Sequence, residues 1–188
     1  RYRLTEKDRA AMQDFRHEIC PRFTAFSPVT QSKPTINDLY KLLIQDKTRN
    51  QMLVEDIIAA VNDHRTPLVL TKFKEHARLL HEALQKRGVL SILLIGGGST
   101  KEREDKRDSL KQSSREEGLV LIATGKYIGE GFNFPRLDTL FLTVPVSWKG
   151  NIAQYAGRLH RDFDGKENVV IYDYVDVHVK MLERMYQK

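Results

Sequence analysis

Short apolar runs separated by amphipathic stretches dominate the chain from residue 67 onward. Glycine, proline, asparagine or charged residues bound each run, which is typical of buried strands in a parallel sheet. The pattern predicts strands at residues 68–70, 89–95, 119–123, 139–144 and 168–174. One helix is predicted over residues 74–87, ended by Gly88, and another opens at Ser99. Alternating strands and helices predict an α/β fold with a mostly parallel sheet and flanking helices.

The first third of the chain lacks that alternation. Thr5–Asp8 resembles a helix start, and apolar residues follow irregularly as far as Ile19. Prolines and small polar residues then mark an irregular connector. Further helices are predicted near Thr35 and over residues 48–62. We therefore expect residues 1–66 to form a helical N-terminal extension that packs on a core domain formed by residues 67–188.

Composition narrows the class of protein. Of the 188 residues, 40% are hydrophobic and 30% charged, as in globular proteins. No apolar run approaches the ~20 residues that span a bilayer, so no membrane partner is expected. The net charge of +6 is compatible with nucleic acid but does not establish it. The single cysteine, Cys20, favours a reducing, cytoplasmic setting. The chain opens at Arg1 without an initiator methionine or a signal-peptide pattern, and we expect it to be a fragment of a longer protein.

A possible phosphate-binding array lies near residue 158. Gln154, Arg158 and Arg161 stand four and three residues apart, so on a helix they share one face. Gly157 leaves room beside them for a close neighbour. Two guanidiniums and an amide on one face suit a phosphate chain. For an arginine pair without further context, a solvated basic face would be the better interpretation.

The context is a second motif. Residues 154–161 read Gln-x-x-Gly-Arg-x-x-Arg, and residues 130–135 read Glu-Gly-Phe-Asn-Phe-Pro. In this order, each after a predicted strand, they resemble motifs VI and V of superfamily 2 helicases, closest to the DEAD/DEAH-like, type III restriction-like branch. The resemblance covers roughly residues 68–175. These proteins are ATP-driven translocases built from two RecA-like domains, and the resemblance implies that this chain is the C-terminal RecA-like domain.

The resemblance implies roles for these residues. Arg158 and Arg161 would act as arginine fingers on the γ-phosphate of ATP, and Gln154 would position a phosphate, a water or the neighbouring domain. The resemblance implies three further residues that contribute to binding the ATP cofactor: Gly131, Asn133 and Gly157. Many family members carry Asp where Asn133 stands. An amide cannot form an ion pair with an arginine, so the strength of coupling between motifs V and VI is left open.

ATP and Mg²⁺ would be held mainly by an N-terminal RecA-like domain outside this chain. The chain lacks a Gly-x-x-x-x-Gly-Lys-[Ser/Thr] loop, because residues 96–101 have the wrong spacing and Tyr127 replaces the hydroxyl after Gly125-Lys126. No Asp-Glu-x-His-like acidic box follows a strand. We expect no ATP hydrolysis by this chain alone, and the six histidines show no metal-binding spacing.

The loops after the strands carry the expected nucleic-acid contacts. In the resembling family, Thr124 and Gly125 would meet the nucleic-acid backbone through a hydroxyl and exposed N–H groups. Parallel strands present their carboxyl ends together, so the loops after the first two strands should join that edge. Their candidates are Thr71, Lys72, Gly97, Ser99 and Lys101. The alternative is an ordinary turn or a solvated loop. We interpret Trp148 as a core lid rather than a base-stacking residue.

We therefore expect the second RecA-like domain of an ATP-dependent helicase or translocase acting on DNA. A non-catalytic nucleic-acid-binding module of the same shape is the alternative, but degenerate relatives of that kind would have lost the finger arginines. A regulatory nucleotide-binding domain working alone is disfavoured because the P-loop is absent. The sequence leaves DNA against RNA, polarity and true unwinding open.

Overall fold

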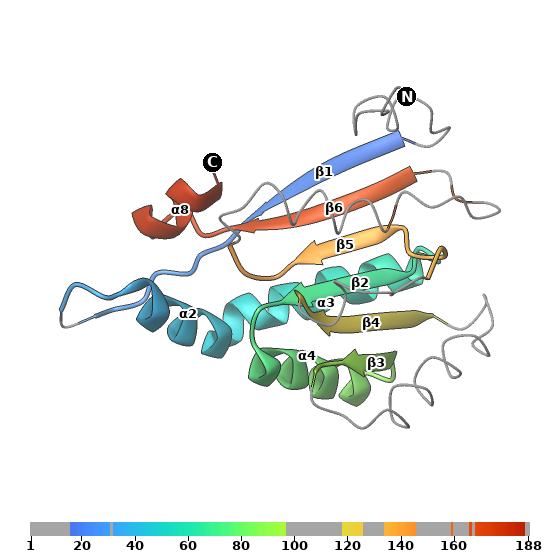
Figure 1. Ribbon diagram of the computed structural model, residues 1–188, viewed down its shortest axis with the longest axis horizontal. Coiled ribbons are helices and arrows are strands. Elements are labelled where there is room, and N and C mark those ends of the chain that lie inside the picture. The colour runs from blue at the N-terminus through green and yellow to red at the C-terminus, as the bar shows by residue number, and fades with distance from the viewer. Residues whose placement is uncertain are drawn as a thin grey trace, which may run out of the picture.

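One parallel sheet organises the chain. The computed structural model describes residues 16–30, 32–96, 118–125, 134–145, 159, 166 and 168–186. Within these residues six strands lie in the order β1-β6-β5-β2-β4-β3, and every neighbouring pair is parallel (Figure 1). The strands are β1 (Arg16–Phe23), β2 (Pro67–Thr71), β3 (Leu90–Leu94), β4 (Leu119–Thr124), β5 (Thr139–Leu142) and β6 (Asn168–Val175). The helices are α2 (Ile36–Gln45), α3 (Lys47–Asn62), α4 (Lys74–Lys86) and α8 (Lys180–Tyr186).

Each central strand is apolar on both faces, as a parallel sheet covered on two sides requires. All residues of β2, β4 and β5 are buried. Along β2, Leu68 and Leu70 belong to one core cluster, and Val69 between them belongs to the other. The cluster of Leu68 also contains Leu137 and Leu159, both fully buried. The continuous apolar runs in the sequence therefore correspond to strands that face two cores.

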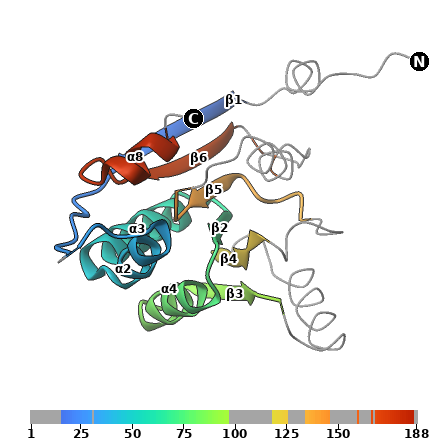
Figure 2. The same cartoon turned by 60° about the vertical axis from the view of Figure 1, so that its left-hand side comes forward.

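Helices α3 and α4 cover one face of the sheet (Figure 2). Leu53, Val54 and Ile57 of α3 and Leu80 and Leu84 of α4 are buried in the core cluster that contains Val69. Because these apolar residues recur at helical spacing, each helix presents one apolar stripe to the sheet. The predicted helices over 48–62 and 74–87 are confirmed within a residue at each end. Gly88 ends α4 with a φ of 75°, a conformation that glycine adopts without strain.

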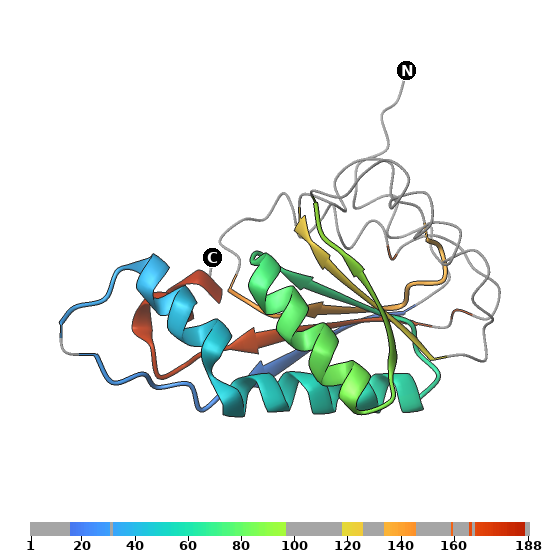
Figure 3. The same cartoon turned by 90° about the horizontal axis from the view of Figure 1, so that it is seen from below.

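A separate lobe of α2 and α8 sits beyond the carboxyl ends of the strands (Figure 3). Its apolar centre contains Leu39, Leu43 and Leu182, together with Val144 after β5. Thr35 caps α2 in a capping box with Asp38, and the helix starts near Thr35 as the sequence predicts. The lobe therefore stands at the edge of the sheet where ligand-binding loops are expected. We call this edge the carboxyl edge.

The expectation of helical structure as far as Ile19 is wrong. Residues 16–23 form strand β1, which pairs in parallel with β6 over its whole length. The helix start expected at Thr5–Asp8 lies outside the described residues. Residues 16–62 supply one strand and a covering helix to the same sheet, and the division of the chain at residue 66 stays a prediction.

Candidate functional site at the carboxyl edge of the sheet

Strands β2 and β4 bring two of the predicted contact residues side by side. Thr71 and Thr124 are register partners at the last positions of these strands. Their side chains are nearly buried, with exposed fractions of 4% and 6%. Lys72 and Gly125 follow immediately, so the structure gathers four of the predicted nucleic-acid residues at one edge. The other three, Gly97, Ser99 and Lys101, lie outside the described residues.

The hydroxyl of Thr71 is engaged in a buried hydrogen-bond network. Nδ2 of Asn50 donates to the carbonyl of Ile44 at 2.8 Å, which turns its Oδ1 toward Nε2 of His76 at 3.0 Å. An amide oxygen only accepts, so Nε2 carries the proton of a neutral His76 ring and Nδ1 is an acceptor. Nδ1 lies 3.0 Å from Oγ1 of Thr71, and the Thr71 hydroxyl therefore donates to it.

His76 is held neutral by this environment. Its side chain is fully buried on α4, and burial lowers the pKa of His76 from 6.5 to about 3, with a further contribution from the nearby charge of Arg49. The Thr71 oxygen meanwhile accepts the backbone N–H of Phe73 at 3.3 Å. With its proton given to His76 and its oxygen accepting from Phe73, the Thr71 hydroxyl is committed to this network.

Thr124 presents a different situation. Among the described residues its hydroxyl has no hydrogen-bond partner, and the half-buried Gly125 follows it. A buried hydroxyl without a partner is costly unless a ligand or water satisfies it. Of the two paired threonines, Thr124 is the one whose hydroxyl the described residues leave without a partner.

Lys72 is exposed, and aromatic rings support it. Its ammonium nitrogen lies 5.0 Å from the ring centre of Tyr40 and 5.8 Å from that of Phe73, within the range of cation–π attraction. The hydroxyl of Tyr40 donates to the carbonyl of Pro145 at 3.0 Å, which fixes the ring. These contacts restrict the side chain of Lys72 and hold its ammonium group at the carboxyl edge.

A basic hollow continues from this point. It has a volume of about 450 Å³ and is lined by Lys33, Lys180, Met181, Arg184 and Met185. The Tyr40 hydroxyl lies 3.9 Å from the sulfur of Met185, so the ring under Lys72 touches the wall of the hollow. Among the described residues, none of the three cations of the hollow forms an ion pair. We call this surface the basic hollow.

An ion pair that sequence reasoning missed lies beneath the edge. Nε of Arg49 on α3 donates to Oδ1 of Asp176 at 2.8 Å, and both side chains are fully buried. Nη1 of Arg49 donates to the carbonyl of Thr143 at 2.7 Å. These bonds tie α3 to the chain just after β5 and β6. Burial and the charge of Asp176 raise the pKa of Asp173 in β6 to about 6.

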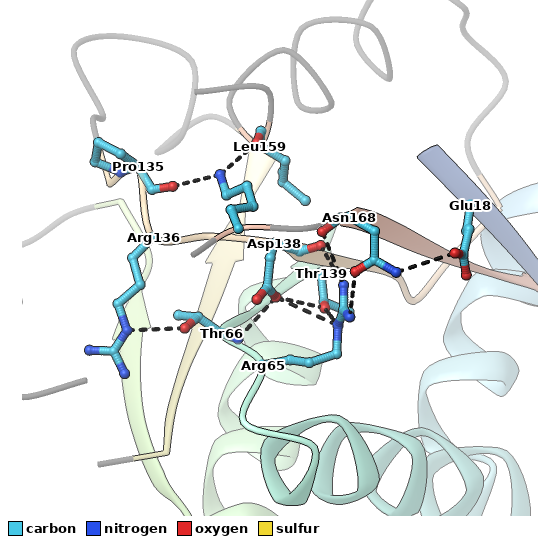
Figure 4. Close-up of polar contacts among 10 residues, drawn as sticks. Glu18, Arg65, Thr66, Pro135, Arg136, Asp138, Thr139, Leu159 and Asn168 are labelled. Atoms are coloured by element: carbon cyan, nitrogen blue, oxygen red, sulfur yellow. Dashed lines mark hydrogen bonds and ion pairs between the residues drawn. The ribbon is translucent and has the colours of Figure 1, made fainter. Parts of the chain in front are cut away.

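Polar contacts also fix the opposite ends of the strands (Figure 4). Arg65 donates to Oδ1 of Asn168 at 2.8 Å, and the N–H of Thr66 donates to Oδ1 of Asp138 at 3.0 Å. Near them, Nζ of Lys166 donates to the carbonyl oxygens of Pro135 at 2.6 Å and Leu159 at 2.8 Å. Backbone carbonyls give no sequence signal, and Lys166 was not predicted as a functional residue.

The motif residues themselves fall elsewhere. Outside the described residues lie Gly131, Asn133, Trp148, Gln154, Gly157, Arg158 and Arg161. Their roles stay predictions. Two neighbours are described: Pro135, which ends the first motif, and Leu159, which stands between the arginines of the second.

The family is identified by comparison with known proteins. Residues 48–163 match the helicase conserved C-terminal domain family, and this match spans β2, β4, β5 and both sequence motifs. The chain belongs to this family. It is a helicase C-terminal domain with the parallel-sheet fold of its structural neighbours, as the motifs predicted.

Curated relatives come from poxviruses. The chain is 28% identical over 163 residues to transcript termination protein A18 of Fowlpox virus (strain NVSL), covering 84% of this chain and 34% of that protein. It is 28% identical over 147 residues to transcript termination protein OPG145 of Variola virus, covering 77% of this chain and 29% of that protein. The chain spans about a third of the length of these relatives.

Solved structures share the fold of this helicase C-terminal domain. The crystal structure of T4 UvsW has a TM-score of 0.68 at 16% identity, covering 91% of this chain and 37% of that chain. The C-terminal part of the Fun30 ATPase domain has a TM-score of 0.64 at 18% identity, covering 80% of this chain and 50% of that chain. In the described part of the chain, no helix has the length and apolarity to cross a membrane. The same residues contain no group of three or more His, Cys, Asp or Glu side chains placed to hold a metal ion.

Proposed function

We propose that this helicase C-terminal domain is the second RecA-like half of an ATP-dependent helicase or translocase. The observation that carries the proposal is the family match over residues 48–163, which contains both motifs and both candidate finger arginines. Such a domain closes on a nucleotide held by its partner domain and reopens after hydrolysis. Alternating grip on a nucleic-acid strand between the two states produces directional motion.

On the nucleotide side, the chain supplies donors rather than a phosphate loop. Arg158 and Arg161 contact the γ-phosphate, Arg161 stabilising the charge that develops as the phosphoryl group is transferred, and Gln154 positions a phosphate or water. Gly131, Asn133 and Gly157 stand on the same side. ATP and Mg²⁺ are bound mainly by the N-terminal RecA-like domain, because this chain lacks the P-loop and the acidic box.

On the nucleic-acid side, three described features support contact with a phosphate backbone. Thr124 has a buried hydroxyl without a hydrogen-bond partner among the described residues, and Gly125 follows it. Lys72 is oriented by Tyr40, and the basic hollow continues the line of positive charge with three cations. Phosphate contacts of this kind fix position on a strand without reading its sequence. We propose DNA as the track.

The alternative is a non-catalytic binding module with the same fold. Retention of both arginines favours the motor. The viral relatives are named transcript termination proteins. A transcript is RNA made on DNA, so RNA and a DNA–RNA hybrid belong among the test ligands.

The test is ATP turnover by the full-length protein, with and without single- and double-stranded DNA, RNA and the hybrid. We expect strong stimulation by one nucleic acid and loss of that stimulation in Arg161→Ala, with ATP binding retained. Stabilisation by such an arginine is worth roughly 10³–10⁵ in rate where it is known. Undiminished turnover in Arg161→Ala would remove the finger assignment. Absence of turnover with every ligand, when the first domain is intact, would support the binding module instead.

A further inference from the structure

One lysine connects the two sequence motifs through the backbone. Nζ of Lys166 donates to the carbonyl of Pro135 and to that of Leu159, and the two carbonyl oxygens turn toward it from different segments (Figure 4). The lysine is half-buried and stands two residues before β6. A charged donor gives hydrogen bonds that are shorter and stronger than those of a neutral one. The distances of 2.6 and 2.8 Å are of this kind.

The positions of the two acceptors give this contact its meaning. Pro135 is the last residue of the first motif and lies two residues after Asn133. Leu159 is bonded directly to Arg158 and precedes Arg161 by two residues. The side chain of Leu159 is fully buried in the core cluster of β2, and Phe134 packs on the same cluster. Leu159, which stands between the two arginines, is thus held both by its buried side chain and by its carbonyl.

We propose that Lys166 is a positioning residue that couples the two motifs of this domain. By holding both carbonyls on one ammonium, it fixes the segment that carries Arg158 and Arg161 relative to the segment that carries Asn133. The inference rests on the proposed function, in which those arginines act on ATP. It also answers the question raised by Asn133, which cannot form an ion pair with an arginine. Here the side chain of Lys166 links the two motifs by binding one backbone carbonyl from each.

A purely structural role for Lys166 predicts something different. Loss of its bonds would then lower stability and leave the folded protein's chemistry unchanged. A positioning role predicts that folded protein turns over slowly, because small displacements of a catalytic group cost rate heavily. It further predicts that the loss acts through the arginines, so Lys166→Met should cost less rate once Arg161 has been removed.

The experiment uses the full-length protein and single-turnover ATP hydrolysis with saturating nucleic acid. Lys166→Met removes the donors at nearly constant length, and Lys166→Arg keeps both charge and donors. Lys86→Met is the matched control, because Lys86 is an exposed lysine in the last turn of α4. Arg161→Ala and the double variant with Lys166→Met complete a cycle. Thermal unfolding and ATP binding are measured for each, and Lys166→Gln replaces Lys166→Met if that variant does not fold.

We expect Lys166→Met to lower the hydrolysis rate roughly 10- to 100-fold with ATP affinity preserved, and Lys166→Arg to lose less. Added to Arg161→Ala, which leaves Arg158 in place, it should lower the rate by a clearly smaller factor than it does in the wild-type protein. An unchanged rate in folded Lys166→Met overturns the inference, as do losses that multiply in the double variant or a Lys166→Arg loss as large as that of Lys166→Met. A wild-type rate in Arg161→Ala alone is a separate result, which removes the finger assignment and this inference with it.

Discussion

The neutral histidine beneath the carboxyl edge makes a quantitative prediction about pH. His76 has a pKa of about 3 in the folded chain and 6.5 as its ordinary value. Between these values the unfolded chain binds a proton that the folded chain does not. Stability from this group is therefore fully present above pH ~6.5 and is lost as the pH falls toward 3. Burial and the nearby cation of Arg49 both disfavour a charged ring, and no carboxylate is among its hydrogen-bond partners, Thr71 and Asn50.

The magnitude follows from the two pKa values. At pH 5 the unfolded imidazole is about thirtyfold more protonated than neutral, while the folded one stays neutral. The free energy of unfolding then drops by RT ln 30, about 2 kcal/mol relative to pH 7. Asp173 acts in the opposite sense, because its raised pKa of about 6 lets the folded chain take up a proton first. That gain is about 1 kcal/mol at pH 5, so wild-type stability alone would hide half of the effect.

A difference measurement removes this interference. His76→Gln keeps a hydrogen-bonding amide but has no proton to gain, and the contribution of Asp173 is the same in both proteins. Urea unfolding of the 188-residue chain at pH 7, 6 and 5 should show the stability gap between wild type and His76→Gln narrowing by about 2 kcal/mol. His178→Gln, at an exposed histidine, is the control for the substitution itself. A gap for His76→Gln that is constant within about 0.5 kcal/mol would refute the neutral, buried histidine.

Two further predictions concern the basic hollow and the packing of Gly118 against α3. Lys180→Gln combined with Arg184→Gln, in the basic hollow, should make the slope of log affinity against log salt less steep for a single-stranded oligonucleotide. The expected change is about 1.4, because each phosphate contact contributes about 0.7. The same double change at exposed Lys86, which ends α4, and at exposed Arg87, its C-cap, should leave the slope unchanged. Equal slopes for both pairs would exclude the hollow as a contact surface. Gly118→Ala should destabilise the chain by about 1 kcal/mol, because its Cβ would collide with Cγ1 of Val61 on α3. Val61→Ala should relieve that loss in chemical denaturation, and a loss that persists in the double variant would contradict the collision.

The strands of the core domain could be predicted because their signal is local. Leu119–Thr124 is apolar throughout and is buried on both faces, so the run itself reveals the strand. Strand β1 gives no such signal. It carries charged residues and a proline at the edge of the sheet, where Ile19 stays 68% exposed. Its strand character comes from pairing with β6, which no local pattern can show.

The site residues divide in the same way. The adjacency of Thr71 and Thr124 could be predicted, because parallel strands end together. Arg49, His76 and Lys166 could not. Each looks like an ordinary solvated residue in the sequence, and each has partners that only folding brings near: a carboxylate 127 residues away for Arg49, and two backbone carbonyls for Lys166. The predicted fingers, Arg158 and Arg161, came from a motif rather than from any contact.

The pairing of β1 with β6 has a consequence for the order of assembly. Arg16 stands opposite Asn168, and Phe23 opposite Val175, so the first described strand has its only described sheet neighbour in the last one. A ribosome makes the chain from its amino end. During synthesis β1 therefore lacks its partner strand until the other described strands have been made. Pairing of β1 with β6 closes the longest stretch of chain between paired strands and completes the sheet. When the domain is destabilised, the β1 edge should therefore unfold before the centre of the sheet.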